Sequence, residues 1–92
     1  MCGIVGIARR GDQAVDAALL AQMREAIRHR GPDEEGQYVN GPVGLAMRRL
    51  AIIDLKGGQQ PVHNEDRTAW VVFNGEIYNY RALREELEKL GH

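Results

Sequence analysis

The sequence predicts a small α+β domain, and the pattern and length of the chain both point to that class. Short apolar stretches rich in Ile and Val alternate with amphipathic stretches, in the order strand, helix, several strands, helix. The chain has 92 residues, which is enough for one small domain at most. Strands this apolar need cover on both faces, and two helices provide too little of it. We therefore expect the chain to form part of a larger fold.

The N-terminal third predicts one strand and one helix. The apolar run CGIVGIA, residues 2–8, has the composition of a strand that is buried on both faces. Residues 13–29 are expected to form a helix, because their apolar side chains recur at helical spacing. These side chains form one stripe made of Leu19, Leu20, Met23, Ala26 and Ile27. The glycine and proline of RGPDEEG, residues 30–36, then end the helical pattern.

The middle of the chain predicts three more strands. QYV at 37–39 and VGLAMRRLAII at 43–53 are separated by the turn residues NGP. A polar, glycine-containing loop follows at 54–66. TAWVVF at 68–73 is apolar throughout and is the strongest strand candidate.

The C-terminal segment predicts a second helix over 80–90. Asn79 can cap its N-terminus, and Gly91 is a good residue for its C-terminal end. Its buried face is expected to consist of Tyr80, Leu83, Leu87 and Leu90.

The charge balance argues against several classes of partner. Twelve basic and thirteen acidic residues give a net charge of −1, with no block of one sign, so neither nucleic acid nor a membrane is expected as a partner. No apolar run approaches the ~20 residues that span a bilayer, and the N-terminus lacks the pattern of a secretory signal. His29, His63 and His92 are not spaced like metal ligands. We expect a cytoplasmic protein that binds no metal.

Cys2 is the only cysteine, and it directly follows the initiator methionine. An ordinary thiol has a pKa of about 8.5, so it is mostly protonated at neutral pH and needs activation to act as a nucleophile. If Met1 is removed, the α-amino group of Cys2, with a pKa of about 7.7–8, can take the thiol proton. Taken alone, however, the position is more typical of a small cysteine buried in a strand.

Five motifs follow one another along the whole chain: MCGIVGI, RHRGPDEEG, RRLAIIDL, QQPVHNED and VVFNGEIYNYRALREEL. Together they resemble the class II glutamine amidotransferase domain, and within that class the domain found in glutamine-hydrolysing asparagine synthetases. The resemblance implies a partial N-terminal-nucleophile hydrolase fold, an αββα sandwich that is truncated here. It also implies that residues 1–92 are the N-terminal part of the amidotransferase domain and that the synthetase domain is absent.

The resemblance implies a function for Cys2, which matches the cysteine that attacks the side-chain amide of L-glutamine. The ammonia released would serve asparagine synthesis from aspartate in the missing synthetase domain. ATP and magnesium are expected only there, so no cofactor is expected in this chain, and the full-length protein is expected to pair as a homodimer. Because an aspartate-bearing segment that completes glutamine recognition is also missing, we expect weak or no activity from the chain alone.

Two alternatives to this function stay open at the level of the sequence. The chain could begin a related amidotransferase that acts on another carboxylate acceptor. It could also be a non-catalytic fragment that acts as a binding or regulatory partner.

The NGE motif matches residues around the reaction centre of the family. Asn74 and Gly75 match the oxyanion hole, in which a side-chain amide and a backbone N–H stabilise the negative oxygen of the intermediate. Without the resemblance, the same dipeptide is a common β-hairpin turn. Glu76 matches a residue near the α-amino group of glutamine, and its alternative is a surface carboxylate.

The RRLAII motif matches residues that hold glutamine. Arg49 matches the arginine that binds the α-carboxylate, a task that suits the two parallel donors of a guanidinium. Arg48 points to the opposite face of the strand and is expected in solvent. Ile52 and Ile53 match positions that help line the glutamine pocket, largely through their backbone, while their side chains are more typical of ordinary core.

The HRGPDEEG motif at 29–36 matches a signature loop of the family. Arg30 and Asp33 are expected to order this loop close to the thiol through ion pairs or hydrogen bonds. Met47 is a departure, because many members of the family carry histidine at the matching position.

Overall fold

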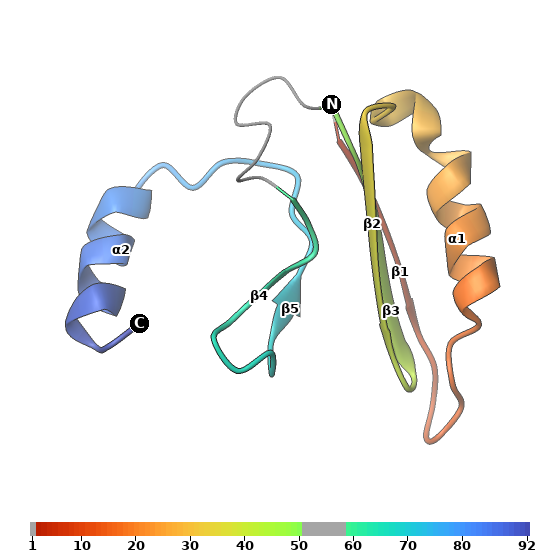
Figure 1. The fold of residues 1–92 in the computed structure, drawn as a ribbon, viewed down its shortest axis with the longest axis horizontal. Helices are drawn as coiled ribbons and strands as arrows, with labels where there is room; N and C mark the ends of the chain where they lie inside the picture. The colour runs from red at the N-terminus through yellow and green to blue at the C-terminus, as the bar shows by residue number, and fades with distance from the viewer. Residues whose placement is uncertain (1, 51–58) are drawn as a thin grey trace.

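A computed structural model of the chain describes residues 2–50 and 59–92. Its elements, in chain order, are β1 (Gly3–Ala8), α1 (Ala17–Ala26), the 3-10 turn η1 (Arg28–Arg30), β2 (Glu34–Asn40), β3 (Val43–Arg49), β4 (Val62–His63), β5 (Trp70–Val71) and α2 (Tyr80–Lys89). Across the longest axis, Figure 1 shows α1, then the sheet of β1, β2 and β3, then the β4–β5 hairpin, then α2. The described elements are a mixture of helices and antiparallel sheets, which agrees with the predicted α+β class, and the αββα sandwich stays a prediction.

The larger sheet is antiparallel and has the order β1-β3-β2, so β3 is its central strand. The predicted NGP turn is confirmed: β2 and β3 pair from Asn40↔Val43 onward, and Gly41 has a positive φ of 54° in the turn. The register places Gly3 of β1 opposite Arg48. The two neighbouring arginines of β3 therefore lie beside the start of β1, next to Cys2.

Helix α1 covers one face of this sheet and forms the core with it (Figure 1). Leu20 and Ala46 are fully buried, Val15 is nearly so, and Val5, Ile7 and Val39 pack against them. A Cβ atom on Gly44 would lie 2.9 Å from the Leu20 side chain, so a glycine there allows the helix to approach β3 closely.

Helix α1 is shorter than the predicted 13–29 at both ends. The carboxylate of Asp16 accepts a hydrogen bond from the Ala18 N–H at 2.9 Å and caps the helix there. The N–H of Val15 instead donates to the carbonyl of Gly41 at 2.8 Å, which ties this residue to the β2–β3 turn. Leu19, placed on the buried stripe by its spacing, is 48% exposed.

The β4–β5 hairpin packs on the other face of the sheet (Figure 1). The ring of Trp70 stacks on that of Tyr38 in β2, with centroids 3.9 Å apart. In the turn, the Asn64 side-chain oxygen accepts hydrogen bonds from the N–H groups of Thr68 and Ala69. Strand β4 thus lies inside the predicted loop, and β5 is shorter than the predicted 68–73.

Helix α2 forms where the sequence predicts it, but its apolar face is not buried within the described part of the chain. Tyr80, Leu83, Leu87 and Leu90 are between 40% and 75% exposed. Asn79 stands at the N-cap position, yet its side chain makes no capping hydrogen bond. Beyond the helix, His92 contacts Glu65 of the hairpin turn at 2.8 Å. No helix among residues 2–50 and 59–92 has the length and apolarity needed to cross a membrane.

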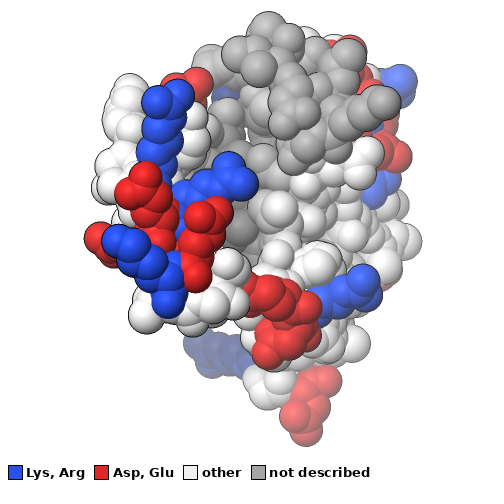
Figure 2. Space-filling model, turned by 60° about the vertical axis from the view of Figure 1, so that its left-hand side comes forward, with Lys and Arg blue, Asp and Glu red and all other residues white. Residues whose placement is uncertain are grey.

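Figure 2 shows acidic and basic side chains interspersed on the face that it presents, with no broad area of one sign. This distribution agrees with the net charge of −1.

Two carboxyl groups of the hairpin turn have shifted pKa values. Hydrogen bonds from the side chain and backbone of Thr68 lower the pKa of Asp66, and a backbone hydrogen bond together with His92 lowers that of Glu65.

Candidate active site

The backbone carbonyl of Cys2 is the point where distant parts of the chain meet. Its oxygen accepts one hydrogen bond from the side-chain amide of Asn74 at 3.0 Å and one from Arg30 Nε at 3.3 Å. Asn74 is 72 positions away in the sequence and Arg30 is 28 positions away. The structure therefore brings together the predicted nucleophile, one predicted oxyanion-hole residue and the signature loop.

The contact of Asn74 is with the backbone of Cys2, the partly buried residue that carries the thiol. An amide nitrogen carries two hydrogens, so one of them can donate to a second acceptor. The hairpin-turn interpretation of the NG dipeptide is wrong. Strand β5 ends at Val71, and the next element after Asn74 and Gly75 is helix α2.

Arg48 is buried, and its predicted place in solvent is wrong. Only 4% of the residue is exposed, because β3 is the central strand and α1 covers this face. Its guanidinium donates to the carbonyl of Gly31 at 2.8 Å and to that of Pro32 at 3.2 Å, and it pairs with Glu35. Arg48 therefore anchors the signature loop that carries Arg30.

The signature loop lies directly on the backbone of β3. A Cβ atom on Gly31 would clash with the backbone of Arg48, so no larger residue fits there without a shift. The Asp33 N–H donates to the carbonyl of Arg49 at 3.1 Å, so the contact between the loop and β3 extends to Arg49. The expectation that Arg30 and Asp33 take part in ordering this loop near the thiol agrees with these contacts.

Arg49 points to the opposite face of the sheet and is 7% exposed. Its Nη1 atom lies 2.9 Å from a carboxylate oxygen of Glu34, its cross-strand partner in β2. The residue that matches the carboxylate-binding arginine of the family thus already holds a carboxylate of its own chain. Sequence reasoning missed Glu34, although the β2–β3 register would have revealed it.

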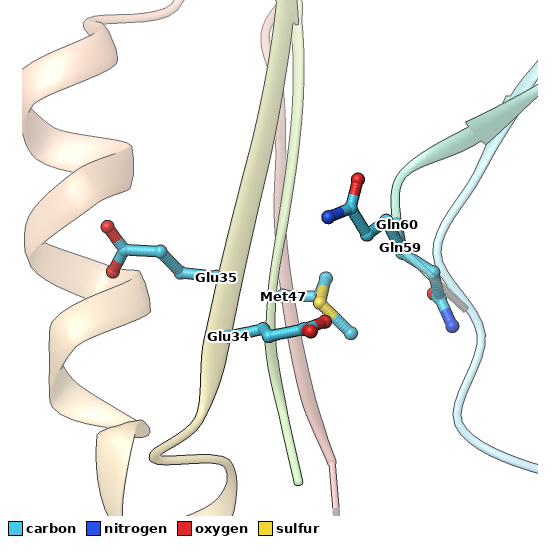
Figure 3. Close-up of a pocket in the computed structure, with 5 residues that line it drawn as sticks. All are labelled: Glu34, Glu35, Met47, Gln59 and Gln60. Atoms are coloured by element: carbon cyan, nitrogen blue, oxygen red, sulfur yellow. The ribbon is translucent and has the colours of Figure 1, made fainter. Parts of the chain in front are cut away.

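A polar cavity of about 250 Å³ lies next to this ion pair, lined by Glu34, Glu35, Met47, Gln59 and Gln60. In Figure 3, Glu34 and Met47 project from the sheet toward Gln59 and Gln60, whereas Glu35 projects toward the other face. Cavities for drug-sized ligands measure roughly 300–1,000 Å³, so this one suits a ligand of about amino-acid size.

The remaining predicted site residues lie elsewhere. Gly75 and Glu76 line a second, more open cavity of about 540 Å³ together with Phe73, Ile77, Tyr78 and Tyr80. The structure does not bring Glu76 to the cavity beside Glu34. Ile52 and Ile53 lie outside the described residues. Among the residues that are described, no group of three or more His, Cys, Asp or Glu side chains could hold a metal ion.

Comparison with known proteins adds independent evidence. A family model described as a glutamine amidotransferase domain matches residues 1–92. The chain is 50% identical over 95 residues to asparagine synthetase (glutamine-hydrolyzing) 1 of Bacillus subtilis (strain 168). The aligned region covers 100% of this chain and 15% of that protein. It is 47% identical over 90 residues to asparagine synthetase (glutamine-hydrolyzing) 2 of the same organism, covering 95% of this chain and 12% of the relative.

A plant relative gives the same result. Asparagine synthetase (glutamine-hydrolyzing) 1 of Arabidopsis thaliana is 44% identical over 89 residues, which cover 96% of this chain and 15% of that protein. The chain thus spans between 12% and 15% of the length of these curated relatives. With the family model matching from the first residue to the last, the chain belongs to the glutamine amidotransferase domain family.

Proposed function

We propose that Cys2 hydrolyses the side-chain amide of L-glutamine, and that the ammonia serves asparagine synthesis from aspartate in a synthetase domain outside this chain. The observation that carries the proposal is the hydrogen bond of 3.0 Å between the Asn74 amide and the Cys2 carbonyl. It joins the first motif, which contains the only cysteine of the sequence, to the last motif, which contains Asn74. The names of the relatives, which all specify glutamine-hydrolysing asparagine synthetases, support the same chemistry.

The proposed reaction begins with activation of the thiol by the amine of the same residue, once Met1 is removed. The amine takes the proton, and the sulfur attacks the amide carbon of glutamine to form a tetrahedral intermediate. The Asn74 amide and the Gly75 backbone N–H stabilise its negative oxygen, and each such donor contributes about 3 kcal/mol to lowering the barrier.

Two further steps complete the proposed reaction: loss of ammonia from the tetrahedral intermediate and hydrolysis of the resulting thioester. The amine returns its proton to the leaving nitrogen, the carbon–nitrogen bond breaks, and ammonia departs to leave a glutamyl thioester on Cys2. Water attacks this thioester with the same amine as base, which releases glutamate and restores the thiol. These steps require no metal or cofactor, and we assign ATP and magnesium to the activation of aspartate in the synthetase domain.

Recognition of glutamine is proposed to centre on Arg49 and the cavity beside it. The guanidinium would hold the α-carboxylate through two parallel hydrogen bonds, in competition with Glu34, which occupies its Nη1 atom. Glu76 and the backbone of Ile52 and Ile53 are proposed to complete the pocket. The 92-residue chain is expected to show weak or no turnover by itself, because it spans so little of its relatives.

The proposal is tested by labelling Cys2 with 6-diazo-5-oxo-L-norleucine, a diazoketone analogue of glutamine, in a grafted synthetase in which this chain replaces the segment that it matches in asparagine synthetase 1 of Bacillus subtilis. Intact-mass analysis first establishes whether Met1 is absent. We expect one label per chain on Cys2, protection by L-glutamine, and no label on the Cys2→Ala variant. A chain that retains Met1 and whose thiol reacts with iodoacetamide but not with the diazoketone would overturn the proposal and favour a non-catalytic binding partner.

A further inference from the structure

The side chain of Gln60 binds both backbone polar groups of Phe73. Its Oε1 atom accepts a hydrogen bond from the Phe73 N–H at 2.7 Å, and its Nε2 atom donates to the Phe73 carbonyl at 2.9 Å. Two residues that face each other in a hydrogen-bonded pair of an antiparallel sheet exchange the same two hydrogen bonds. Here a side-chain amide takes the place of one of the two backbones.

The position of Gln60 fits this substitution. Strands β4 and β5 pair through Val62↔Val71 and His63↔Trp70, and extending that register by two residues brings Gln60 opposite Phe73. The amide of Gln60 therefore prolongs the hairpin ladder beyond the last pair of backbones, to the residue directly before Asn74.

The backbone of Gln60 is itself held against the larger sheet. A Cβ atom on Gly36 of β2 would clash with the Gln60 carbonyl oxygen, so the two backbones are in direct contact. Gln60 also lines the cavity beside Glu34. It thus connects the sheet that carries Arg49 with the segment that carries Asn74 and Gly75.

We propose that Gln60 is a positioning residue for the oxyanion hole, and that its amide fixes Phe73 so that Asn74 and Gly75 face Cys2. Two contacts transmit this effect. Asn74 follows Phe73 and donates to the Cys2 carbonyl, and the Phe73 ring lies against Gly75, where a Cβ atom would be 2.8 Å from it. The inference rests on the proposed glutaminase function, because only that function gives these donors an oxyanion to stabilise.

The decisive variant is Gln60→Glu, which has the same shape and keeps the acceptor for the Phe73 N–H. It replaces the donor with an oxygen that faces the Phe73 carbonyl, so the pair becomes repulsive. Gln22→Glu is the matched control, because Gln22 lies on the exposed surface of helix α1, outside the cavity, and the change adds the same charge. Gln60→Leu, which removes both hydrogen bonds without adding charge, is the second test variant.

The readout is the ratio of two labelling rates at Cys2 in the same grafted synthetase. The diazoketone places its carbonyl oxygen where the amide oxygen of glutamine would lie, so its reaction depends on the oxyanion hole. Iodoacetamide reports only on the exposure and ionisation of the thiol. We expect Gln60→Glu and Gln60→Leu to lower the diazoketone rate by about 10- to 100-fold, since a displacement of ~1 Å has effects of that size, with the iodoacetamide rate within about twofold of the parent.

The pH profile separates positioning from general damage. A protonated carboxyl can donate as the amide does, so the deficit of Gln60→Glu relative to the parent should shrink as the pH falls toward about 4.3. The deficit of Gln60→Leu should not change. A general loss of structure would change the iodoacetamide rate as well as the diazoketone rate, at every pH, and circular dichroism identifies a variant that fails to fold.

The possible failures are distinguishable. A parent protein that reacts with the diazoketone, together with a Gln60→Glu variant that reacts as fast as Gln22→Glu, would overturn the role of Gln60 alone. A parent chain that reacts with iodoacetamide but not with the diazoketone would overturn the glutaminase proposal, and the role of Gln60 with it.

Discussion

Arg48 Nε donates to the backbone carbonyl of Gly31 across 2.8 Å, inside the protein rather than at its surface. This contact fixes the signature loop against the central strand, and the same loop reaches the carbonyl of Cys2 through Arg30. One buried side chain thus connects the sheet, the loop and the start of the chain. The predictions below test this arrangement and the site that it supports.

Replacing Arg48 with Met should destabilise the chain. The change removes the donor of two loop carbonyls and leaves Glu35 with Arg24, at 3.4 Å, as its ion-pair partner. We expect the free energy of unfolding to fall by about 2–3 kcal/mol. Urea unfolding followed by circular dichroism measures the change. Arg28→Met is the control, because Arg28 forms an exposed pair with Glu25 that should contribute less than about 0.5 kcal/mol. Equal midpoints for the two variants would contradict the anchoring role.

Replacing Gly36 with Ala should release the hairpin from the sheet. The added Cβ would clash with the Gln60 carbonyl oxygen, so the backbones must separate, at a cost of about 1–3 kcal/mol. Trp70 is the single tryptophan and stacks on Tyr38, so its fluorescence reports the separation. Gly6→Ala is the control, because its Cβ would have ordinary contacts at 3.5 Å. Unchanged fluorescence in both variants would refute the close contact.

The role of Arg49 can be tested in a grafted synthetase, in which this chain replaces the segment that it matches in asparagine synthetase 1 of Bacillus subtilis. Arg49→Lys should raise KM for glutamine by about 10-fold, because a point charge cannot reproduce two parallel hydrogen bonds, and should leave kcat within about twofold. Steady-state assay of glutamate release measures both constants. A wild-type KM would exclude Arg49 as the carboxylate ligand.

Glu34 should oppose substrate binding, because its carboxylate occupies Arg49 Nη1 at 2.9 Å. Glu34→Gln in the same grafted synthetase removes the competing charge and keeps the shape of the side chain. We expect KM for glutamine to fall by about threefold, which is within the range of ~0.5–1.5 kcal/mol for one altered hydrogen bond. An increase in KM would show instead that Glu34 holds Arg49 in the geometry that binds substrate.

Acid should loosen the β4–β5 turn. Hydrogen bonds from the side chain and backbone of Thr68 lower the pKa of Asp66 below its ordinary value of 3.8. A lowered folded-state pKa means that the carboxylate stabilises the turn above the unfolded pKa and that this contribution disappears as the pH falls through the folded pKa. Trp70 fluorescence between about pH 6 and 2 should therefore show a transition below ~4. Asp66→Asn should have a smaller one, and identical curves would contradict the assignment.

The sequence predicts the strands and helices better than it predicts which faces they bury. Period-two alternation correctly separates Arg48 from Arg49, yet it cannot show that α1 and the signature loop cover the Arg48 side. The apolar spacing of α2 correctly predicts a helix, but the face remains exposed because no other described element covers it. Such errors arise because burial depends on contacts between segments that are far apart in the sequence.

The candidate site shows the same limit. The motif resemblance selects Cys2, Asn74 and Arg49 in advance, and the structure brings the first two together. Gln60 could not be selected, because a side chain that replaces a backbone in a sheet ladder leaves no periodic signal. Its contacts become visible only once the β4–β5 register and the close approach at Gly36 are known.

The central claim is that the free amine of Cys2 activates the sulfur beside it. Its most direct test compares one protein with two N-termini: the grafted synthetase with a removable extension before Cys2, assayed for glutamate release before and after the extension is cleaved. We expect turnover only after cleavage exposes the amine, whereas iodoacetamide should alkylate the thiol in both forms. Equal glutaminase rates in the extended and cleaved forms would contradict it.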